Sequence, residues 1–443
     1  MDIVIDLTIL LVTLVLGVPV PFCFMAAVLF MVVAGGGFSP IFLMSNGFNG
    51  INSLAVLCIL YFILMGGLMS SGGIAGRLID ISDSILGKTK SGLGTVAVVS
   101  SAIFGSIAGT SSAAVAAIGS IMIPRMVERG YPRSHATALI SAASVESQLI
   151  PPSVPMILYA WVTWQSVAAC FLSTVVPGIL MVISYSIANW LMVRKYPIKV
   201  LPPSTVRQQA RNFGSSVYNG LFALFLPVIV LGGIYGGVFT PTEAAGIATL
   251  YCIPVGFFNY KSLNVRMFIE ATVSSVTTTG VIVLMVFFVM ILSKVYIMQN
   301  VPQRLIATLF GVTENKYLLL LLVNLFLLIL GMLMDDFSGT LLAATLLFPL
   351  MTRLGINPMH FAAILGTNLG LGNKTPPTAP ILYLACRIGN CPIDQVMKPQ
   401  LILIFTCSIP VVLLTTFFPP LSMTLPHLIM PKIVPHVPLF IGG

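Results

Sequence analysis

A proline-rich apolar stretch occurs twice in this chain. Residues 124–160 can be laid over residues 349–385 without a gap, at a constant offset of 225 positions. Nine of the 37 aligned pairs are identical: Pro124/Pro349, Met126/Met351, Gly130/Gly355, His135/His360, Ala138/Ala363, Pro151/Pro376, Pro152/Pro377, Pro155/Pro380 and Ala160/Ala385. Both copies contain Pro-Pro-x-x-Pro, and proline interrupts a helix because it lacks a backbone donor and clashes with the preceding turn. Two such interruptions in apolar sequence predict two discontinuous membrane helices at a repeat interface, as in many transporters.

The composition excludes an ordinary soluble domain. The chain is 57% hydrophobic and only 7% charged, whereas soluble domains carry about 25% charged residues. Many apolar runs reach the roughly 20 residues that a helix needs to cross a bilayer. The sequence therefore predicts an all-α polytopic membrane protein. The first run, residues 3–34, has no basic start and no small-residue cleavage site, so we expect a retained membrane segment there and not a signal peptide.

The formal net charge of +9 does not indicate nucleic-acid binding. The basic residues are scattered over short loops, without the contiguous basic face that nucleic acid requires, and a positive-inside bias explains them. The seven cysteines and four histidines are too dispersed for a disulfide framework or a metal cluster. His135 and His360 recur at the repeat offset, and we expect a structural role for both. We expect no organic cofactor.

The apolar runs divide the chain into two similar halves. The N-terminal half, residues 1–193, contains a helical hairpin at 92–123 and a broken helix at 134–165. The C-terminal half, residues 217–443, contains the corresponding hairpin at 317–352 and broken helix at 358–388. Between them, residues 194–216 are polar and basic, and we expect this linker to be a cytoplasmic loop.

The charge distribution then sets the orientation of the two halves. With the linker in the cytoplasm, most lysines and arginines fall inside, and Lys374 is left within the membrane. The first hairpin enters from the cytoplasm and the second from the opposite side. The sequence thus predicts an inverted repeat with two re-entrant hairpins, which is the symmetry that underlies alternating access.

The first hairpin contains Gly105-Ser-Ile-Ala-Gly-Thr-Ser-Ser-Ala-Ala114. Small residues permit a sharp turn at membrane depth, where irregular backbone is tolerated only if it is buried or lines a cavity. Their hydroxyl and carbonyl oxygens suit a monovalent cation better than a transition metal. Close helix packing through small residues is the alternative explanation.

The second hairpin contains Gly331-Met-Leu-Met-Asp-Asp-Phe-Ser-Gly-Thr340. Adjacent carboxylates such as Asp335 and Asp336 are costly in an apolar hairpin unless they are paired, protonated or close to a cation. They indicate a functional site, and the alternative is a loop at the membrane surface in contact with water.

Each hairpin precedes a helix break, at Glu146–Ser153 and at Gly370–Thr378. A break frees backbone carbonyls, and the half-helix that follows begins with N–H groups that attract anions. We expect cations at the freed oxygens and an anionic substrate between the two breaks.

Four motifs together resemble the large membrane subunit of tripartite ATP-independent periplasmic (TRAP) transporters. They are Gly105–Ala114, Leu149–Tyr159, Gly237–Ala244 and Thr375–Thr378. The resemblance covers essentially the whole chain. It implies a transporter and not an enzyme, with an elevator-type scaffold and transport domain that imports an organic acid together with Na⁺ across the bacterial inner membrane. It also implies two partners, a small four-helix membrane subunit and a periplasmic substrate-binding protein, besides membrane lipid.

The resemblance also implies candidate site residues. One sodium site is expected at the first tip and break, formed by Thr110, Ser111, Ser112, Ser147 and Pro151. A second sodium site is expected at Asp335, Gly372 and Thr375. The candidates for substrate contact are Glu146, Ser153, Asn368 and Lys374.

The chain departs from the family pattern at several of these positions. Ala114 stands where an Asp is common, Gln148 where a Pro is usual, and Glu146 and Lys374 where apolar residues are usual. We hypothesise that Glu146 and Lys374 face a shared polar cavity and either pair with each other or bind substrate. If they pair, Lys374→Leu damages uptake and Glu146→Leu partly restores it.

Three other functions stay open at this point. A stand-alone sodium/dicarboxylate symporter has similar architecture. A channel lacks support, because no repeated pore ring or charged gating helix is present. An intramembrane hydrolase lacks a nucleophile elbow or a metalloprotease motif. For the substrate, C4-dicarboxylates, keto acids, sugar acids and sialic acids fit the sequence equally.

Overall fold

The computed structural model describes residues 2–35, 38–86, 89–198, 206–313, 315–376 and 378–440. Within these ranges the chain forms helices and no strands, which confirms the all-α class. Five helical segments of the described chain are long and apolar enough to cross a membrane: α4 (Leu54–Ser71), α10 (Val167–Val193), α15 (Val265–Met298), α17 (Lys316–Leu333) and the continuous segment Ile393–Phe417. A bent pair, Phe213–Asn219 and Leu221–Tyr235, adds a sixth if it is one span.

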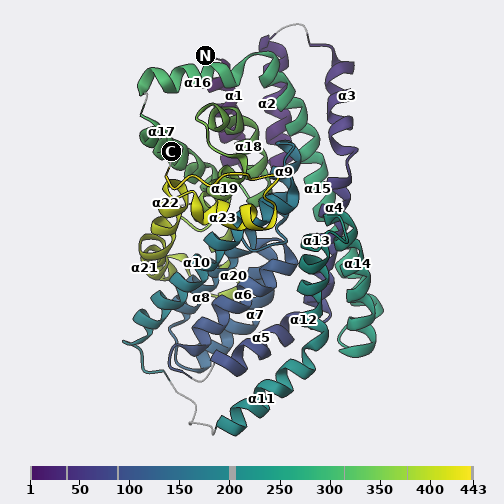
Figure 1. The fold of residues 1–443 in the computed structure, drawn as a ribbon, viewed down its shortest axis with the longest axis vertical. Coiled ribbons are helices and arrows are strands. Elements are labelled where there is room, and N and C mark those ends of the chain that lie inside the picture. Colours follow the sequence, from purple (N-terminus) through teal and green to yellow (C-terminus); the bar gives the residue numbers. More distant parts are fainter. Residues whose placement is uncertain are drawn as a thin grey trace.

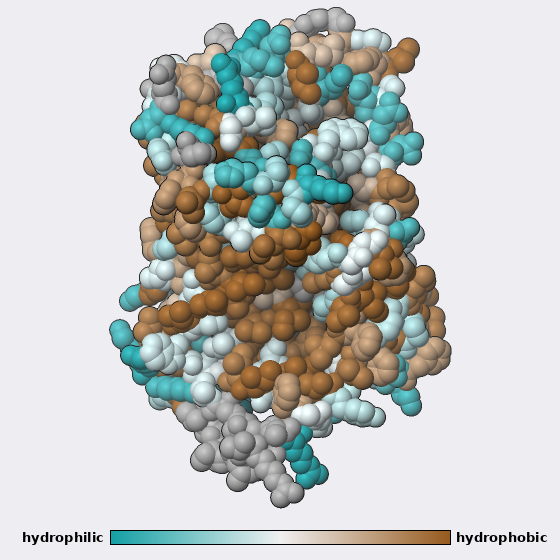
Figure 2. All heavy atoms as spheres, viewed as in Figure 1, coloured by the Kyte–Doolittle hydropathy of each residue, from teal (hydrophilic) through white to brown (hydrophobic). Residues whose placement is uncertain are grey.

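The surface of these helices suits a lipid environment. On α10, Ile179, Ile183 and Ile187 are each about half exposed, and their spacing of four residues places them on one face of the helix. Figure 2 shows hydrophobic side chains across the middle of the molecule, with hydrophilic side chains gathered towards its upper and lower ends. Exposed apolar area of this extent is typical of a protein surrounded by lipid.

The first apolar run forms two helices where we expected one membrane segment. α1 (Asp2–Val15) and α2 (Val20–Gly35) pack against each other. The chain turns between them at Gly17, whose φ of +82° is easily adopted only by glycine. Pro19 follows, and it cannot continue a helix from the preceding turn.

The repeat extends well beyond the proline motifs. In the first half the order is α5 (Ile74–Leu86), α6 (Gly92–Ala108), α7 (Ser111–Glu128), α8 (Arg133–Ser144), α9 (Val154–Val162) and α10. In the second half it is α16 (Val301–Val312), α17, α18 (Asp336–Arg353), α19 (Pro358–Gly372), α20 (Pro380–Gly389) and the segment formed by α21 (Ile393–Leu403), η4 (Ile404–Ser408) and α22 (Ile409–Phe417). Each of these six elements of the first half therefore has a counterpart about 225 residues later.

The corresponding elements lie towards opposite ends of the molecule. Figure 1 shows α5, α6 and α7 in its lower half and α16, α17 and α18 in its upper half. In each half the two hairpin helices pack against each other. The first hairpin turns at Gly109, with φ +69°, and Thr110. The second hairpin turns at Met334 and Asp335.

A layer of long helices covers one side of the hairpins. α2, α3 (Pro40–Ile51) and α4 pack against α15, and α14 (Pro241–Pro254) packs against α4. Figure 1 shows α3, α4 and α14 along its right side. α14 begins with a capping box, in which the Thr240 side chain and the Glu243 side chain each bond to the other residue's backbone N–H. Two N–H groups at the start of α14 are thereby satisfied reciprocally.

Part of the linker is helical, where we expected an open loop. Residues 206–219 form α11 (Val206–Asn219), which packs against α5, while residues 199–205 lie outside the described part. The remaining elements are α12 (Leu221–Pro227), η2 (Val228–Gly232), α13 (Gly233–Tyr235), η3 (Val255–Asn259) and α23 (Pro420–Ile429).

The two repeated histidines form hydrogen bonds between the starts of the broken helices and neighbouring helices. His135 Nε2 lies 3.1 Å from the side-chain oxygen of Asn189 on α10. His360 Nε2 lies 3.2 Å from the carbonyl oxygen of Thr416 on α22. Both imidazoles are buried, so these contacts give each histidine the structural role that the sequence predicted.

Candidate functional site

The first helix break connects α8 to α9 through one 3₁₀ turn, η1 (Val145–Gln148). The Pro151–Pro152 bond that follows is cis. The Ser153 hydroxyl donates to the Gln148 carbonyl oxygen over 2.7 Å and so closes the break on itself. The Val154 N–H then donates to the Gly109 carbonyl oxygen at the first hairpin tip, 3.2 Å away. This bond joins the first break to the first tip.

The second break lies between α19 and α20, and Pro377 within it is outside the described residues. Gly372 touches the second hairpin directly, since a Cβ at this position would lie 2.5 Å from the Cα of Gly331. The Thr375 hydroxyl donates to the Leu371 carbonyl oxygen over 2.6 Å. The Thr378 hydroxyl donates to the carbonyl oxygen of Met332. The second break is therefore joined to the second hairpin as the first break is to the first.

Both tips and both breaks meet at a buried group of side chains, which we call the central polar cluster. It consists of Ser111, Ser147, Gln148, Asp336 and Asn373, all of them buried. The Asp336 Oδ1 accepts from the Gln148 amide nitrogen at 2.5 Å and from the Asn373 amide nitrogen at 2.6 Å. The Asp336 Oδ2 accepts from the Ser111 N–H at 3.2 Å. One carboxylate thus joins both repeats.

The residues of this cluster are related by the repeat offset. Ser111 and Asp336 are 225 positions apart and are bonded to each other. Gln148 and Asn373 are equivalent by the same offset, and both bond to Asp336. In a two-fold arrangement a residue meets its own equivalent only close to the symmetry axis. The cluster therefore lies where such an axis between the halves would pass.

Several oxygens in the cluster have capacity left for a further partner. The Ser111 hydroxyl accepts from the Gln148 amide at 3.1 Å and from the Ser147 hydroxyl at 3.2 Å. The side-chain carbonyl oxygens of Gln148 and Asn373 are buried, and neither has a hydrogen-bond partner among the described residues. A buried acceptor without a donor is costly, so these two oxygens distinguish the cluster from an ordinary packed core.

The two adjacent carboxylates of the second hairpin have different surroundings. Asp335 is the N-cap of α18 and accepts from the N–H groups of Ser338 at 3.3 Å and Phe337 at 3.4 Å. The Ser338 hydroxyl also donates to it. Asp336 instead points into the central polar cluster and is only 5% exposed. For Asp336, this burial excludes a water-exposed loop at the membrane surface.

A cavity of about 350 Å³ is lined by the first hairpin tip, α4 and α15. Hydroxyl groups line it from both sides: Thr110 and Ser112 from the tip, and Ser274, Ser275 and Thr278 from α15. Phe337, the neighbour of Asp336, reaches it from the second tip. This cavity has donors and acceptors beside the central polar cluster, so it is our candidate substrate cavity.

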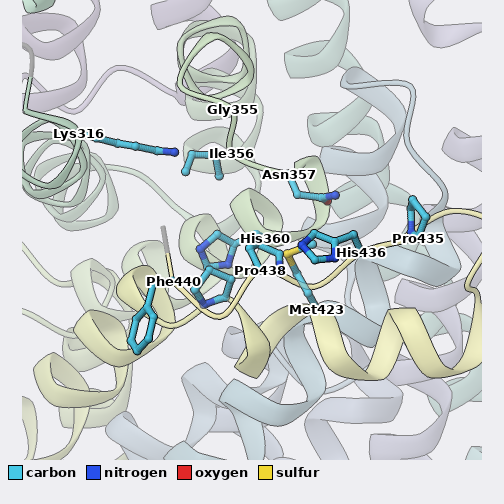
Figure 3. Close-up of a pocket in the computed structure, with 11 residues that line it drawn as sticks. Lys316, Gly355, Ile356, Asn357, His360, Met423, Pro435, His436, Pro438 and Phe440 are labelled. Atoms are coloured by element: carbon cyan, nitrogen blue, oxygen red, sulfur yellow. The ribbon is translucent and has the colours of Figure 1, made fainter. Parts of the chain in front are cut away.

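A larger cavity, of about 470 Å³, lies elsewhere (Figure 3). Lys316, His360 and His436 are among its lining residues, and the segment after α23 covers one side of it. No residue of the central polar cluster lines it. It lies at the base of the second hairpin and away from the two helix breaks, so we do not assign the substrate to it.

Glu146 and Lys374 come close enough to interact electrostatically, but no nitrogen–oxygen contact within 4.0 Å joins them in the described chain. Each is only 1% exposed. The Lys374 ammonium donates to the Tyr185 hydroxyl and lies 4.9 Å from the centre of that ring. Within the part of the chain that the structure describes, neither carboxylate oxygen of Glu146 has a hydrogen-bond partner. The two charges share the core behind the breaks, and neither residue lines a described cavity.

The remaining expected residues are distributed as follows. Asn368 donates to the Asn324 side-chain oxygen at 2.9 Å, between α17 and α19 and away from the candidate cavity. Ser111 and Ser147 lie in the central polar cluster, whereas Thr110 and Ser112 line the cavity. The first break contains Pro151 and Ser153, and the second contains Gly372 and Thr375.

Gln148 and Asn373 were not expected as site residues, and Asp336 was expected only as one of two adjacent carboxylates and not as a cation ligand. The repeat offset could have found them, because it pairs Ser111 with Asp336 and Gln148 with Asn373. Neither pair is identical, so neither stands out among the nine identities between the copies.

Helical hairpins and interrupted helices that meet at a buried polar centre define this protein as a helical membrane transporter. Two solved transporter structures share the fold. The YdaH transporter of Alcanivorax borkumensis aligns with a TM-score of 0.57 and 15% identity, over 84% of this chain and 86% of that one. MtrF of Neisseria gonorrhoeae aligns with a TM-score of 0.61 and 13% identity, over 85% and 83%.

Sequence comparison then gives the family. Residues 7–421 match the DctM component of the tripartite ATP-independent periplasmic transporters, and the chain belongs to this family. The sialic acid TRAP transporter large permease protein SiaM of Vibrio cholerae is 32% identical over 94% of this chain and 96% of its own length. The C4-dicarboxylate TRAP transporter large permease protein DctM of Pseudomonas aeruginosa is 32% identical over 84% and 86%.

A third relative is longer than this chain. The isethionate TRAP transporter permease protein DctMQ of Oleidesulfovibrio alaskensis is 33% identical over 93% of this chain, which spans 64% of the length of that permease. These relatives are transporter permeases and not enzymes. The protein is accordingly a multi-pass TRAP large permease.

Proposed function

We propose that this permease carries a small organic acid across the bacterial inner membrane, driven by the inward movement of Na⁺. The acid is delivered by a periplasmic substrate-binding protein, and a small four-helix membrane subunit completes the transporter. The observation that carries the proposal is the meeting of both hairpin tips and both helix breaks at one buried polar cluster. A site shared by two halves is the element that alternating access requires.

Sodium as the driving ion is supported by the chemistry of the tips and breaks. Hydroxyl groups of Thr110, Ser111 and Ser112 surround the first tip, and the Asp335 carboxylate stands at the second. Hard oxygen donors suit an alkali cation, and the described residues include no cluster of soft ligands there. We retain the two sodium sites of the sequence analysis, one at each tip with its break.

The inverted repeat and the elevator movement are part of the same proposal. They are supported by the positions of the two hairpins towards opposite ends of the molecule and by the excess of basic residues on one side of the proposed topology. The helices around the hairpin tips would move as a body against α4 and α15, with the candidate cavity between them.

An organic acid is supported by the candidate cavity and by the relatives. A volume of about 350 Å³ lies within the range of small-molecule sites. α9 and α20 begin at the two breaks, and the positive ends of their helix dipoles favour an anion. Isethionate, sialic acid and C4-dicarboxylates, which the names of the relatives give, are all organic acids.

The test is uptake into proteoliposomes that contain this permease and its small subunit. The substrate-binding protein proposed as its partner is first screened by thermal shift with isethionate, succinate and sialic acid, and the acid that stabilises it is the substrate for uptake. We expect uptake only with an inward sodium gradient, with choline as the control cation. Passive flux without sodium would support a channel instead. Equal uptake without the small subunit would support the stand-alone symporter.

A further inference from the structure

We propose that Asp336, Gln148, Asn373 and Ser111 form a third cation site, for one monovalent cation, on the axis between the two halves. It is an additional site besides the two sodium sites proposed at the tips and breaks, and it shares only Ser111 with the first of them. The choice of Na⁺ as its ion rests on the proposed function. The site itself rests on the contacts and burial of these four side chains.

The carboxylate of Asp336 is buried without a compensating cation. No lysine, arginine or histidine nitrogen lies within 4.0 Å of it in the described chain. The buried ammonium of Lys374 is committed to Tyr185. A carboxylate within a membrane is costly unless a charge or strong donors compensate it. Here the compensation consists of neutral donors only, the two amide NH₂ groups and the Ser111 N–H.

The same two amides have acceptor oxygens without donors. When the nitrogens of Gln148 and Asn373 face Asp336, their carbonyl oxygens remain buried and unpaired. An amide carries an oxygen and a nitrogen of almost equal size on one planar group. Rotation of each amide about its last side-chain bond therefore exchanges the two atoms without a change in the backbone.

The exchanged arrangement has the composition of a cation site. The two amide oxygens then face the Asp336 carboxylate, with the Ser111 hydroxyl beside them. All of these donors are hard oxygens, which alkali and alkaline-earth cations prefer. They carry one negative charge in total, so a monovalent cation leaves the site neutral. A divalent cation would leave an uncompensated charge in the membrane.

Cation binding at this position would connect the two halves. In the arrangement described here, each amide donates to Asp336 from its own helix break. Binding of the cation replaces both donor contacts at once, because both amides must rotate for their oxygens to reach the ion. The occupancy of the site is thereby linked to both breaks together and not to one of them.

The site can be tested with Na⁺ as the only probe, in the absence of substrate and gradient. The purified permease with its small subunit is equilibrated with radioactive Na⁺ in choline chloride of constant ionic strength, and the bound ions are counted. We expect Asp336→Asn to bind one ion fewer than the wild type. Asp394→Asn, in the first exposed turn of α21, is the matched control and is expected to bind as many ions as the wild type.

Two further variants separate this site from the neighbouring one. Asp335→Asn removes a proposed ligand of the second sodium site, so Asp335→Asn combined with Asp336→Asn is expected to lose two ions if the sites are distinct. Gln148→Met removes one amide at similar length, and it is expected to lose the same ion as Asp336→Asn. If Asp336→Asn does not elute as a single species in size-exclusion chromatography, Gln148→Met is used as the test variant instead.

The third site would be overturned if Asp336→Asn binds as many ions as the wild type. The same holds for Gln148→Met where it is used in place of Asp336→Asn. A double variant that loses only one ion would also overturn it, because Asp335 and Asp336 would then serve the same ion. Failure of the proposed function has a different signature. The equilibrium count then remains as described, while uptake in proteoliposomes is independent of the sodium gradient.

Discussion

The buried charges Glu146 and Lys374 permit a prediction in which the two single variants differ. Lys374→Leu leaves the Glu146 carboxylate with no compensating charge, and neither of its oxygens has a donor. Removal of one partner from a buried pair costs about 3–5 kcal/mol. Glu146→Leu leaves an ammonium that still donates to the Tyr185 hydroxyl and lies over its ring. Because a desolvated cation–π contact contributes about 2 kcal/mol, we expect Glu146→Leu to cost only about 1–3 kcal/mol.

The double variant Glu146→Leu/Lys374→Leu completes this cycle. Replacement of both charges by apolar side chains removes the desolvation penalty as well as the attraction, and such replacements are often close to neutral. We therefore expect the double variant to be more stable than Lys374→Leu by at least about 2 kcal/mol. The assay is thermal and denaturant unfolding of the purified proteins in one detergent, with uptake measured in parallel. Uptake should follow the same order.

Two results would refute this reasoning. In the first, Glu146→Leu destabilises the protein as much as Lys374→Leu, which would mean that Tyr185 does not stabilise the Lys374 ammonium. In the second, the double variant is no more stable than Lys374→Leu, so that the two charges do not interact. Tyr185→Phe removes the hydroxyl and keeps the ring, and it separates the hydrogen bond from the cation–π contact.

Three further predictions follow from individual contacts. Gly372→Ala forces a methyl group against the Gly331 backbone and should destabilise the protein by about 2–3 kcal/mol; the control Gly280→Ala, with open space around it, should be neutral or gain up to about 1 kcal/mol in the same unfolding assay. Thr240→Ala removes the side chain that caps α14 and should lower the unfolding free energy by about 1 kcal/mol. Thr278→Val removes a hydroxyl from the candidate cavity and should raise the KM for uptake by about two- to tenfold, the equivalent of one lost hydrogen bond; Thr277→Val, one residue away and outside that cavity, should leave KM unchanged.

Much of the fold follows from local patterns in the sequence. Apolar runs, the glycine-rich tips and the Pro-Pro-x-x-Pro breaks gave the hairpins and interrupted helices close to their observed bounds, because these features act within a few residues. The turn between α1 and α2 was missed, although Gly17 and Pro19 mark it, because the run around them is long enough for one span. The helix α11 was missed because its packing on α5 is a tertiary contact.

The candidate site was only partly accessible from sequence. The tips and breaks are local, and they identified Thr110, Ser111, Ser112, Ser147 and Asp335 as candidates. The N-cap geometry of α18 decides which of the two adjacent carboxylates points into the cluster. Asp335 caps the helix by accepting from backbone N–H groups of α18, whereas Asp336 accepts from the Ser111 N–H of the other half. Likewise, the sequence alone could not show that Lys374 contacts Tyr185 and not Glu146. The partner of Lys374 depends on how α10 packs against the second break.

The contact between Ser111 and Asp336 has a consequence for how a duplicated chain can diverge. At any place far from the axis, the two copies of a residue can remain identical, because they never meet. On the axis, identical charged residues would face each other, and two carboxylates within contact distance would repel strongly in a membrane interior. A pair of identical carboxylates is therefore excluded where the copies touch, and here Ser111 supplies an N–H donor to the Asp336 carboxylate. The nine identities between the copies all lie outside the central polar cluster, so the sequence similarity that reveals the duplication is lost at the centre, where the two copies touch.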